Sequence, residues 1–286
     1  MSGFQVIDTA PRCRLGEGPL WSDRQQALFW VDILGQSVFR LRLEDAQVAR
    51  WDMPEMIGWL IEREHGAGFV AGFQSGFAYL ELDPLRIRPI ANPEPECTDH
   101  RMNDAKADVH GRIWAGTMPV AADRPTGALY RLDAQGRVTC WDRGYIVTNG
   151  PAFSADGRFA YHNDSGRALV YRFELDADGG LCNRSVFLEF GPQDGKPDGM
   201  TVDAEGGLWI AMWGGARVSR FTPDGLCDRS IGLPASQITS CCFAGPALDR
   251  LFVTSASEGV RDEPLAGSLF EVDARVRGFP ARRFSG

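Results

Sequence analysis

The chain has 286 residues and a formal net charge of −8, with its Lys and Arg residues dispersed. Because nucleic acids and anionic membrane surfaces attract clustered positive charge, the sequence predicts neither as a partner. Apolar residues at 44% and charged residues at 24% exclude a largely disordered chain, and 33 Gly with 17 Pro favour an all-β fold with many turns and few helices.

One pattern recurs along the chain: a short apolar strand, a polar turn, and a second apolar strand rich in aromatic residues. Further strands that alternate apolar and polar residues follow most copies, as half-exposed strands do. The strand pairs are expected, in chain order, within residues 17–33, 57–73, 103–117, 149–162, 197–213 and 239–255.

The regular spacing of these pairs indicates the architecture. Successive clear copies open 41 to 49 residues apart, except for one interval of 86 residues that contains the weak second copy. A period in the forties with about four strands per unit is typical of a β-propeller blade. We predict one domain over residues 1–286, a six-bladed β-propeller with four antiparallel strands per blade around a central channel. A strand within residues 4–8 is expected to complete the last blade, and a two-sheet sandwich would not explain the recurrence.

The polar turns and the aromatic residues have structural explanations. Asp-x-x-Gly recurs at positions 108–111, 133–136 and 203–206. Asp accepts hydrogen bonds from the amides of its own turn, and Gly adopts positive φ there. The Trp and Phe residues in the second strand of each pair are expected to form the blade core.

Three oxygen-bearing side chains occupy the same phase of different repeats. Glu17, Asn149 and Asp198 each open an inner strand one residue before a Gly. Inner strands of a propeller line one channel, so these side chains are expected to converge. Taken singly, each is typical of a turn; three in one phase favour a metal site. Two carboxylates and a carboxamide suit Ca²⁺, Mg²⁺ or Mn²⁺, and Fe²⁺ or Zn²⁺ also fit.

Other catalytic patterns are missing from the sequence. There is no Gly-x-Ser-x-Gly nucleophile motif, and the glycines at positions 66–72 miss the dinucleotide-binding spacing by one residue. The four histidines show no zinc-protease spacing, so each is expected on the surface or in a strand: His65, His100, His110 and His162.

The cysteines and the N-terminus predict a cytoplasmic location. Seven Cys include no Cys-x-x-Cys pair, and the adjacent Cys241 and Cys242 are poorly placed to bridge each other. We expect reduced, mostly buried thiols. The N-terminus lacks a basic segment followed by an apolar stretch, and no run approaches the roughly 20 apolar residues of a membrane helix.

Several motifs together resemble one family. They are Leu-Gly-Glu-Gly-Pro-Leu-Trp at 15–21, Arg-Met-Asn-Asp at 101–104, Gly-Arg-Ile-Trp-Ala-Gly-Thr-Met at 111–118, Thr-Asn-Gly-Pro at 148–151, Pro-Asp-Gly-Met at 197–200 and Thr-Ser-Cys-Cys-Phe at 239–243. In this order, they resemble the SMP-30/gluconolactonase/regucalcin family over essentially the whole chain. The resemblance implies a six-bladed propeller that hydrolyses sugar-acid lactones with one divalent cation, held by Glu17, Asn149 and Asp198.

The resemblance also implies substrate-binding residues. Arg101 and Asn103 would hold the oxygens of the lactone, and we include the neighbouring Asp104 in this set. Trp213 stands just before Gly-Gly in the fifth repeat, which is similar to the bacterial sugar lactonases of the family. An aromatic face there would stack on a sugar ring, and the expected substrate is a pentose- or hexose-derived aldonolactone.

The mechanistic hypothesis is metal-assisted hydrolysis. The cation would polarise the lactone carbonyl, Asp198 would accept the proton of the attacking water, and Arg101 would offset the negative charge that develops on oxygen. Two alternatives stay open: a metal-dependent phosphotriesterase or aryl esterase on the same scaffold, and a non-enzymatic binding platform. The sequence leaves the oligomeric state open and is compatible with a monomer.

Overall fold

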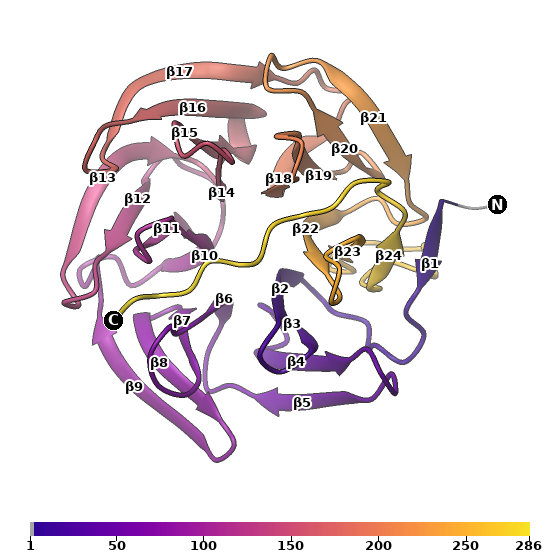
Figure 1. Cartoon of the computed structure of the whole chain (residues 1–286), viewed down its shortest axis with the longest axis horizontal. Helices are drawn as coiled ribbons and strands as arrows, with labels where there is room; N and C mark the ends of the chain where they lie inside the picture. Colours follow the sequence, from indigo (N-terminus) through magenta and orange to yellow (C-terminus); the bar gives the residue numbers. More distant parts are fainter. Residues whose placement is uncertain (1–2) are drawn as a thin grey trace.

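The computed structural model describes residues 3–286, which form six four-stranded antiparallel sheets arranged in a ring (Figure 1). This is the predicted six-bladed β-propeller. The only helical element among the described residues is the short 3₁₀ turn η1 (Ser165–Arg167). No helix of residues 3–286 has the length and apolar character to cross a membrane.

Each blade runs from an inner strand at the channel to an outer strand at the rim. The first three blades are β2 (Gly16–Ser22), β3 (Ala27–Asp32), β4 (Ser37–Arg42) and β5 (Val48–Asp52); β6 (Ile57–Glu62), β7 (Phe69–Phe73), β8 (Gly76–Leu82) and β9 (Leu85–Ala91); β10 (His100–Ala107), β11 (Ile113–Pro119), β12 (Gly127–Leu132) and β13 (Val138–Tyr145). The next two are β14 (Thr148–Phe153), β15 (Phe159–Asp164), β16 (Leu169–Leu175) and β17 (Leu181–Glu189); β18 (Lys196–Val202), β19 (Leu208–Trp213), β20 (Arg217–Phe221) and β21 (Cys227–Gly232). The last is β22 (Ile238–Ala244), β23 (Arg250–Ser255), β24 (Phe270–Val272) and β1 (Phe4–Val6).

The ring closes by pairing the two ends of the strand sequence. Strand β1 forms the outer edge of the last sheet, with Phe4 opposite Val272 in antiparallel register. This confirms the predicted closing strand. Closure brings the first and last blades together, so each blade of the ring packs between two neighbouring blades.

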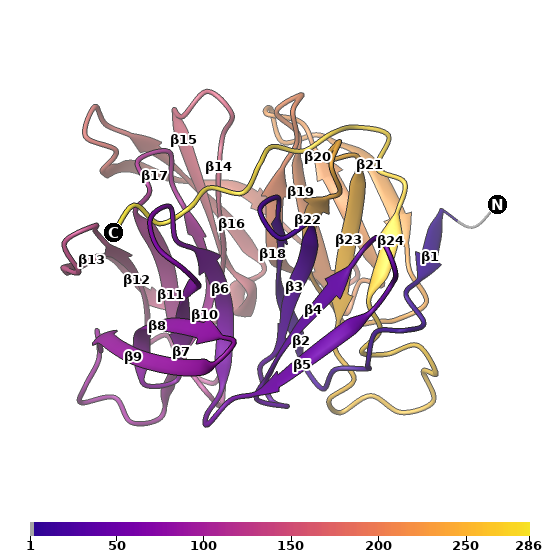
Figure 2. The same cartoon turned by 60° about the horizontal axis from the view of Figure 1, so that its bottom comes forward.

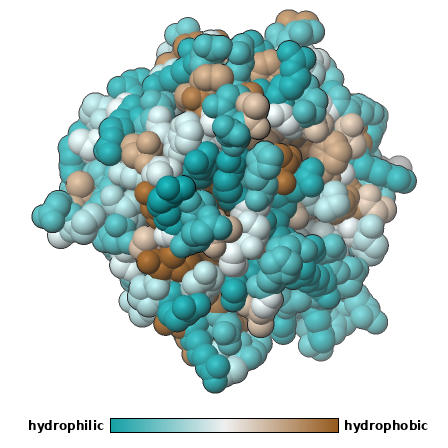
Figure 3. Space-filling model, turned by 60° about the vertical axis from the view of Figure 1, so that its left-hand side comes forward, coloured by the Kyte–Doolittle hydropathy of each residue, from teal (hydrophilic) through white to brown (hydrophobic). Residues whose placement is uncertain are grey.

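Burial decreases from the channel outwards. Every residue of β2 is buried, whereas the outer strand β17 is exposed at its centre. The predicted core aromatics are buried, with Trp30, Trp114 and Trp209 at most 1% exposed. The face shown in Figure 3 is mostly hydrophilic and carries only small hydrophobic areas, as expected for outer strands in contact with water.

The Asp-x-x-Gly turns do more than reverse the chain. Asp203 accepts backbone hydrogen bonds from its own turn, and its Oδ2 also accepts from Trp209 Nε1 at 2.8 Å and from Arg220 Nε at 2.6 Å. Its carboxyl pKa is lowered by the hydrogen bond from Arg220 and by those of Gly207 and Trp209, despite the opposing effect of burial. The turn therefore anchors the blade core as well.

The C-terminal tail, residues 273–286, runs across the end of the channel that carries these turns (Figures 1 and 2). Its backbone forms bridges between Gly278 and Asp203 of blade five and between Phe284 and Arg63 of blade two. Arg283 adds ion pairs to Glu62, Asp23 and Glu64. The tail thus ties blades from opposite sides of the ring together.

The thiols are free, as predicted, but the expectation that most are buried is wrong. Cys13, Cys241 and Cys242 are buried, whereas Cys97 and Cys227 are exposed and Cys140 and Cys182 are intermediate. The exposed thiols lie in the loop before β10 and at the start of the outer strand β21, where the ring provides no cover. The histidines lie in turns or strands, as expected; burial lowers the pKa of His162 in β15 to about 3.

We predict that Asp203→Ala destabilises the fold by about 2–4 kcal/mol, because it leaves Trp209 Nε1 and Arg220 Nε without their acceptor, while Asp228 and Glu205 still pair with the Arg220 guanidinium. Equilibrium denaturant unfolding measures the loss. Asp133→Ala is the matched control: it removes the same type of turn, but its partner Arg137 has a side chain that is 74% exposed. The control should cost roughly 1 kcal/mol, and equal costs for the two variants would contradict the assigned role of Asp203.

Candidate active site

The predicted metal ligands lie where the pairing between an inner strand and its neighbour shifts register. The pairing of β2 with β3 shifts between Glu17 and Leu20, and that of β14 with β15 shifts between Asn149 and Ala152. In β18, the shift between Pro197 and Met200 encloses Asp198. β-Bulges of this kind turn side chains away from the regular ladder. The same structural device therefore places each ligand candidate at the mouth of the channel.

The Gly after each ligand candidate has a steric reason. Gly18 has φ +53° and Gly150 has φ +73°, a left-handed conformation that favours glycine. A Cβ added to Gly150 would lie 2.3 Å from Cε of Met200 on the next inner strand. The Gly thus permits both the bulge and the close approach of neighbouring blades.

The structure brings six predicted site residues together at one end of the channel. All six are at most 7% exposed: Glu17, Arg101, Asn103, Asp104, Asn149 and Asp198. Asn103 Nδ2 donates to Asn149 Oδ1 at 2.8 Å, which links blades three and four. Arg101 Nη1 donates to Asn103 Oδ1 at 2.5 Å and to the Met102 carbonyl at 3.0 Å. Their positions agree with one site, while their individual roles stay predictions.

Negative charge exceeds positive charge in this buried cluster. Burial raises the pKa of Glu17 well above its usual value, and the charges of Asp198 and Asp104 raise it further. Burial and the charge of Asp104 also raise the pKa of Asp198. Burial lowers the pKa of the Arg101 guanidinium to about 10, although Glu17 and Asp198 favour its charged form. The Arg101 guanidinium thus acts on Glu17 and Asp198, whereas Lys106 is the cation that acts on Asp104.

The oxygen atoms of this cluster fit a divalent cation. Asp198 Oδ1 and Asp104 Oδ2 are buried and have no hydrogen-bond partner. Glu17 Oε2 accepts the amide of Gly18 at 3.0 Å, and the Glu17 and Asp198 side chains also share a hydrogen bond. Buried polar atoms are normally satisfied, so orphaned carboxylate oxygens indicate an ion-binding site. Glu17, Asn149 and Asp198 would supply hard oxygen ligands for a cation such as Ca²⁺.

Sequence reasoning missed the residues that orient these ligands. Asn149 Nδ2 donates to Ser165 Oγ at 2.9 Å, and Ser165 Oγ in turn donates to the Pro197 carbonyl at 2.5 Å. Asn163 Nδ2 donates to the Asp198 carbonyl at 2.5 Å. Neither Ser165 nor Asn163 occupies the repeated ligand phase, so no signal in the repeat pointed to them. They lock Asn149 and Asp198 relative to each other across the interface of blades four and five.

Trp213, the predicted wall of the sugar pocket, lies at the end of β19. It is partly buried, pairs with Lys196 at the start of β18 and forms a bridge with Gln237. Because Asp198 follows Lys196 by two residues, Trp213 and Asp198 occupy the same end of blade five. Its contact with a sugar stays a prediction.

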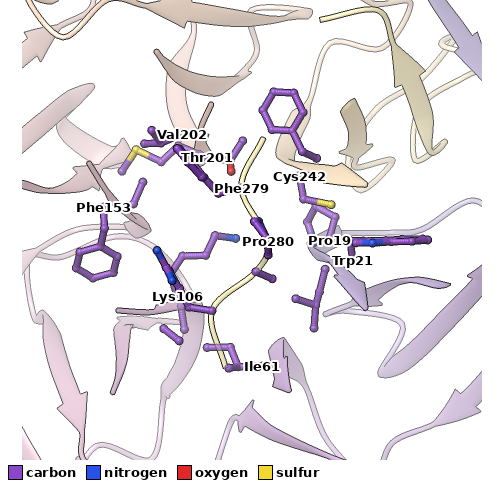
Figure 4. A pocket seen from close by; sticks show the side chains of 18 of the residues that line it. Pro19, Trp21, Ile61, Lys106, Phe153, Thr201, Val202, Cys242, Phe279 and Pro280 are labelled. Atoms are coloured by element: carbon purple, nitrogen blue, oxygen red, sulfur yellow. The ribbon is translucent and has the colours of Figure 1, made fainter. Parts of the chain in front are cut away.

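A cavity of about 150 Å³ lies at the opposite end of the channel, beneath the C-terminal tail. Its walls include Lys106, Cys242, Phe279 and Pro280, and Figure 4 shows these side chains gathered around the tail. None of the predicted metal ligands lines this cavity. Gly18, Ala105 and Met200 also line it, so the cavity approaches the predicted active site from the side of the tail.

The chain matches the SMP-30/Gluconolactonase/LRE-like region across residues 15–257. It belongs to this family. Residues 15–257 include every predicted site residue, so the family relationship covers the whole cluster described above. It also confirms the resemblance seen in the sequence motifs.

Relatives within the SMP-30/Gluconolactonase family span nearly the full chain. The protein is 37% identical to a 6-deoxy-6-sulfogluconolactonase of Pseudomonas putida, with 95% of each chain covered. It is 35% identical to a pentonolactonase of Haloferax volcanii, with 99% of this chain and 98% of that one covered. Its fold matches a calcium-binding protein, regucalcin, from Agrobacterium tumefaciens with a TM-score of 0.94 and 28% identity, over 99% and 97% of the two chains.

We predict that Glu17→Gln stabilises the metal-free protein and abolishes its stabilisation by Ca²⁺. The raised pKa of Glu17 means that the metal-free fold loses stability as pH rises above the ordinary carboxyl pKa of 4.5. The stability advantage of the variant should therefore be absent below pH 4.5 and grow as the pH rises above it.

Thermal melts with EDTA or Ca²⁺ across this pH range provide the measurement. Glu81→Gln, which removes an exposed carboxylate, is the control and should melt like the parent protein. A Glu17→Gln variant that melts below the parent in EDTA at pH 8 would contradict the excess of buried negative charge.

Proposed function

We propose that this protein is a metal-dependent hydrolase that opens a sugar-acid lactone, an aldonolactone of pentose or hexose origin, to the free aldonic acid. The observation that carries the proposal is the buried cluster of Glu17, Asp104 and Asp198 at one end of the channel, with orphaned carboxylate oxygens on Asp104 and Asp198. Relatives named for sulfogluconolactone and pentonolactone hydrolysis support the substrate class.

Glu17, Asn149 and Asp198 would hold the cation. When bound, a divalent cation in an oxygen site polarises the carbonyl of a lactone. The relative from Agrobacterium tumefaciens is described as calcium-binding, which supports Ca²⁺ as the first ion to test. Asn149 is held for this role by the hydrogen bonds to Ser165 and from Asn103.

The side chains would share the hydrolytic step. Asp198 takes a proton from water as its oxygen adds to the lactone carbonyl carbon. The bond between that carbon and the ring oxygen then breaks, and the proton returns to the ring oxygen, which leaves a hydroxyl and a carboxylic acid on one product. Arg101 stands near Glu17 and Asp198 and offsets negative charge on the carbonyl oxygen. Asn103, held by Arg101 and Thr148, would orient the sugar hydroxyls.

We predict that Asp198→Asn lowers kcat for aldonolactone hydrolysis by about 10²–10⁴-fold, since it removes the proton acceptor and one ligand charge. Acid release in a pH-stat measures turnover with pentono- and hexonolactones, with and without EDTA. Asp224→Asn, at an exposed turn, is the control and should keep parental turnover. Near-parental kcat in a folded Asp198→Asn variant would remove Asp198 from the mechanism.

The same assay separates the rival functions. We expect EDTA to abolish lactone hydrolysis and added divalent cation to restore it. A clear preference for aryl esters or phosphotriesters over every aldonolactone would replace the proposed substrate class. Absence of metal-dependent hydrolysis of any of these compounds would instead favour a binding platform.

A further inference from the structure

The loop between β9 and β10 gathers three potential metal ligands that are not among the predicted active-site residues, although His100 directly precedes Arg101. Glu94, Cys97 and His100 follow one another at intervals of three residues. Two successive turns, from the Cys97 amide to the Glu94 carbonyl at 2.9 Å and from the His100 amide to the Cys97 carbonyl at 3.1 Å, fold this loop. The ligand atoms of the three side chains all lie within 4.8 Å of one another.

We propose that Glu94, Cys97 and His100 form a second cation site, selective for a thiophilic divalent ion such as Zn²⁺. A thiolate, an imidazole and a carboxylate oxygen are the ligands that zinc prefers. The site differs in chemistry from the cluster of Glu17, Asn149 and Asp198, which offers oxygen ligands alone. Three protein ligands leave the fourth position of a tetrahedral ion to water.

Outer hydrogen bonds already orient two of the three ligands. His100 Nε2 contacts Thr126 Oγ1 at 2.9 Å, which directs Nδ1 towards Glu94. Glu94 Oε1 accepts the hydroxyls of Thr117 at 2.9 Å and Tyr130 at 3.0 Å. Oε2 is thereby left to face His100 Nδ1. Metal-binding His and carboxylate ligands usually have such supporting partners, and these fix ring and carboxylate orientation before an ion arrives.

The burial pattern provides both a rigid base and an entrance. The side chains of His100 and Glu94 are 5% and 9% exposed, whereas Cys97 is exposed. An ion would reach the buried pair from the side of the thiol. Binding releases the proton of the Cys97 thiol to solvent and replaces the contact of 2.7 Å between Glu94 Oε2 and His100 Nδ1. The imidazole proton then stands on Nε2, which donates to Thr126 Oγ1, and Nδ1 is free to bind the ion. The nitrogen and oxygen ligands of a tetrahedral zinc ion lie farther apart than Glu94 Oε2 and His100 Nδ1 do. A modest rotation of these two side chains would make room for the ion.

The rival explanation is a Glu94–His100 pair that only orders the loop. That pair accounts for two of the residues. It does not require an exposed thiol to lie beside both of them, and Cys97 makes no hydrogen bond through its Sγ among those recorded for residues 3–286. Cys97 is therefore the residue that separates the two explanations.

Cobalt titration of the full-length protein, stripped of metal, tests the proposal. Co²⁺ bound by a thiolate gives a near-ultraviolet charge-transfer band, whereas Co²⁺ in an all-oxygen site gives none. We expect the band in the parent protein to saturate at one equivalent, Zn²⁺ to abolish it, and Cys97→Ser to lack it. Cys227→Ser, which removes another exposed thiol, is the matched control and should keep the band.

A second variant tests the ligand geometry. Thr126→Val removes the partner of His100 Nε2 and should weaken Co²⁺ binding by about 10-fold while the band remains. A parent protein without the band, a band that persists in Cys97→Ser, or a band lost in Cys227→Ser would overturn the proposal. Because Cys97 is not among the proposed catalytic residues, lactone turnover reports on the other site independently.

Discussion

Three carboxyl groups, Glu17, Asp104 and Asp198, share one buried end of the channel with a single guanidinium. Buried charge is costly unless it is paired, and the raised pKa values of Glu17 and Asp198 show that Arg101 alone does not offset it. The rest of the ring must therefore hold these groups together against their repulsion. This requirement explains why the surrounding hydrogen bonds run between blades.

The inter-blade hydrogen bonds supply that constraint. Thr148 Oγ1 donates to the Thr117 carbonyl, Asn163 to the Asp198 carbonyl, and Thr239 Oγ1 to the Gly16 carbonyl. Each bond ties a side chain of one blade to the backbone of its neighbour, next to a site residue. The positions of the ligands thus depend on ring closure, because a missing blade would leave such bonds without partners.

The fold could be predicted from the sequence because every blade repeats the same local pattern. Strands β2, β10, β14 and β18 open at or close to the predicted positions, and the Asp203 turn is where its Asp and Gly indicate. The ligand positions could be predicted for the same reason, since a shared phase implies a shared end of the channel. The roles of residues outside the repeat could not be predicted in this way.

The path of the tail and the pairing of Ser165 with Pro197 depend on contacts between segments far apart in sequence. The cluster of Glu94, Cys97 and His100 lies at the connection between β9 and β10, outside the repeated strand pairs. The three side chains are spaced three residues apart, and they come together only because two turns fold the loop. Periodicity, from which the active site was predicted, carries no information about such a loop.

The tail also bears on how a small molecule reaches the proposed active site. Residues 273–286 cross the end of the channel that carries the Asp-x-x-Gly turns. The Gly278 amide donates to the Leu248 carbonyl there, and the Phe284 amide donates to the Glu62 carbonyl. Glu17 and Asp198 lie near the beginnings of inner strands, at the opposite end. We infer that a substrate enters where the inner strands begin. His100 opens β10 at that same end, so an ion in the second site would stiffen the loop beside the entrance and leave the end under the tail unchanged.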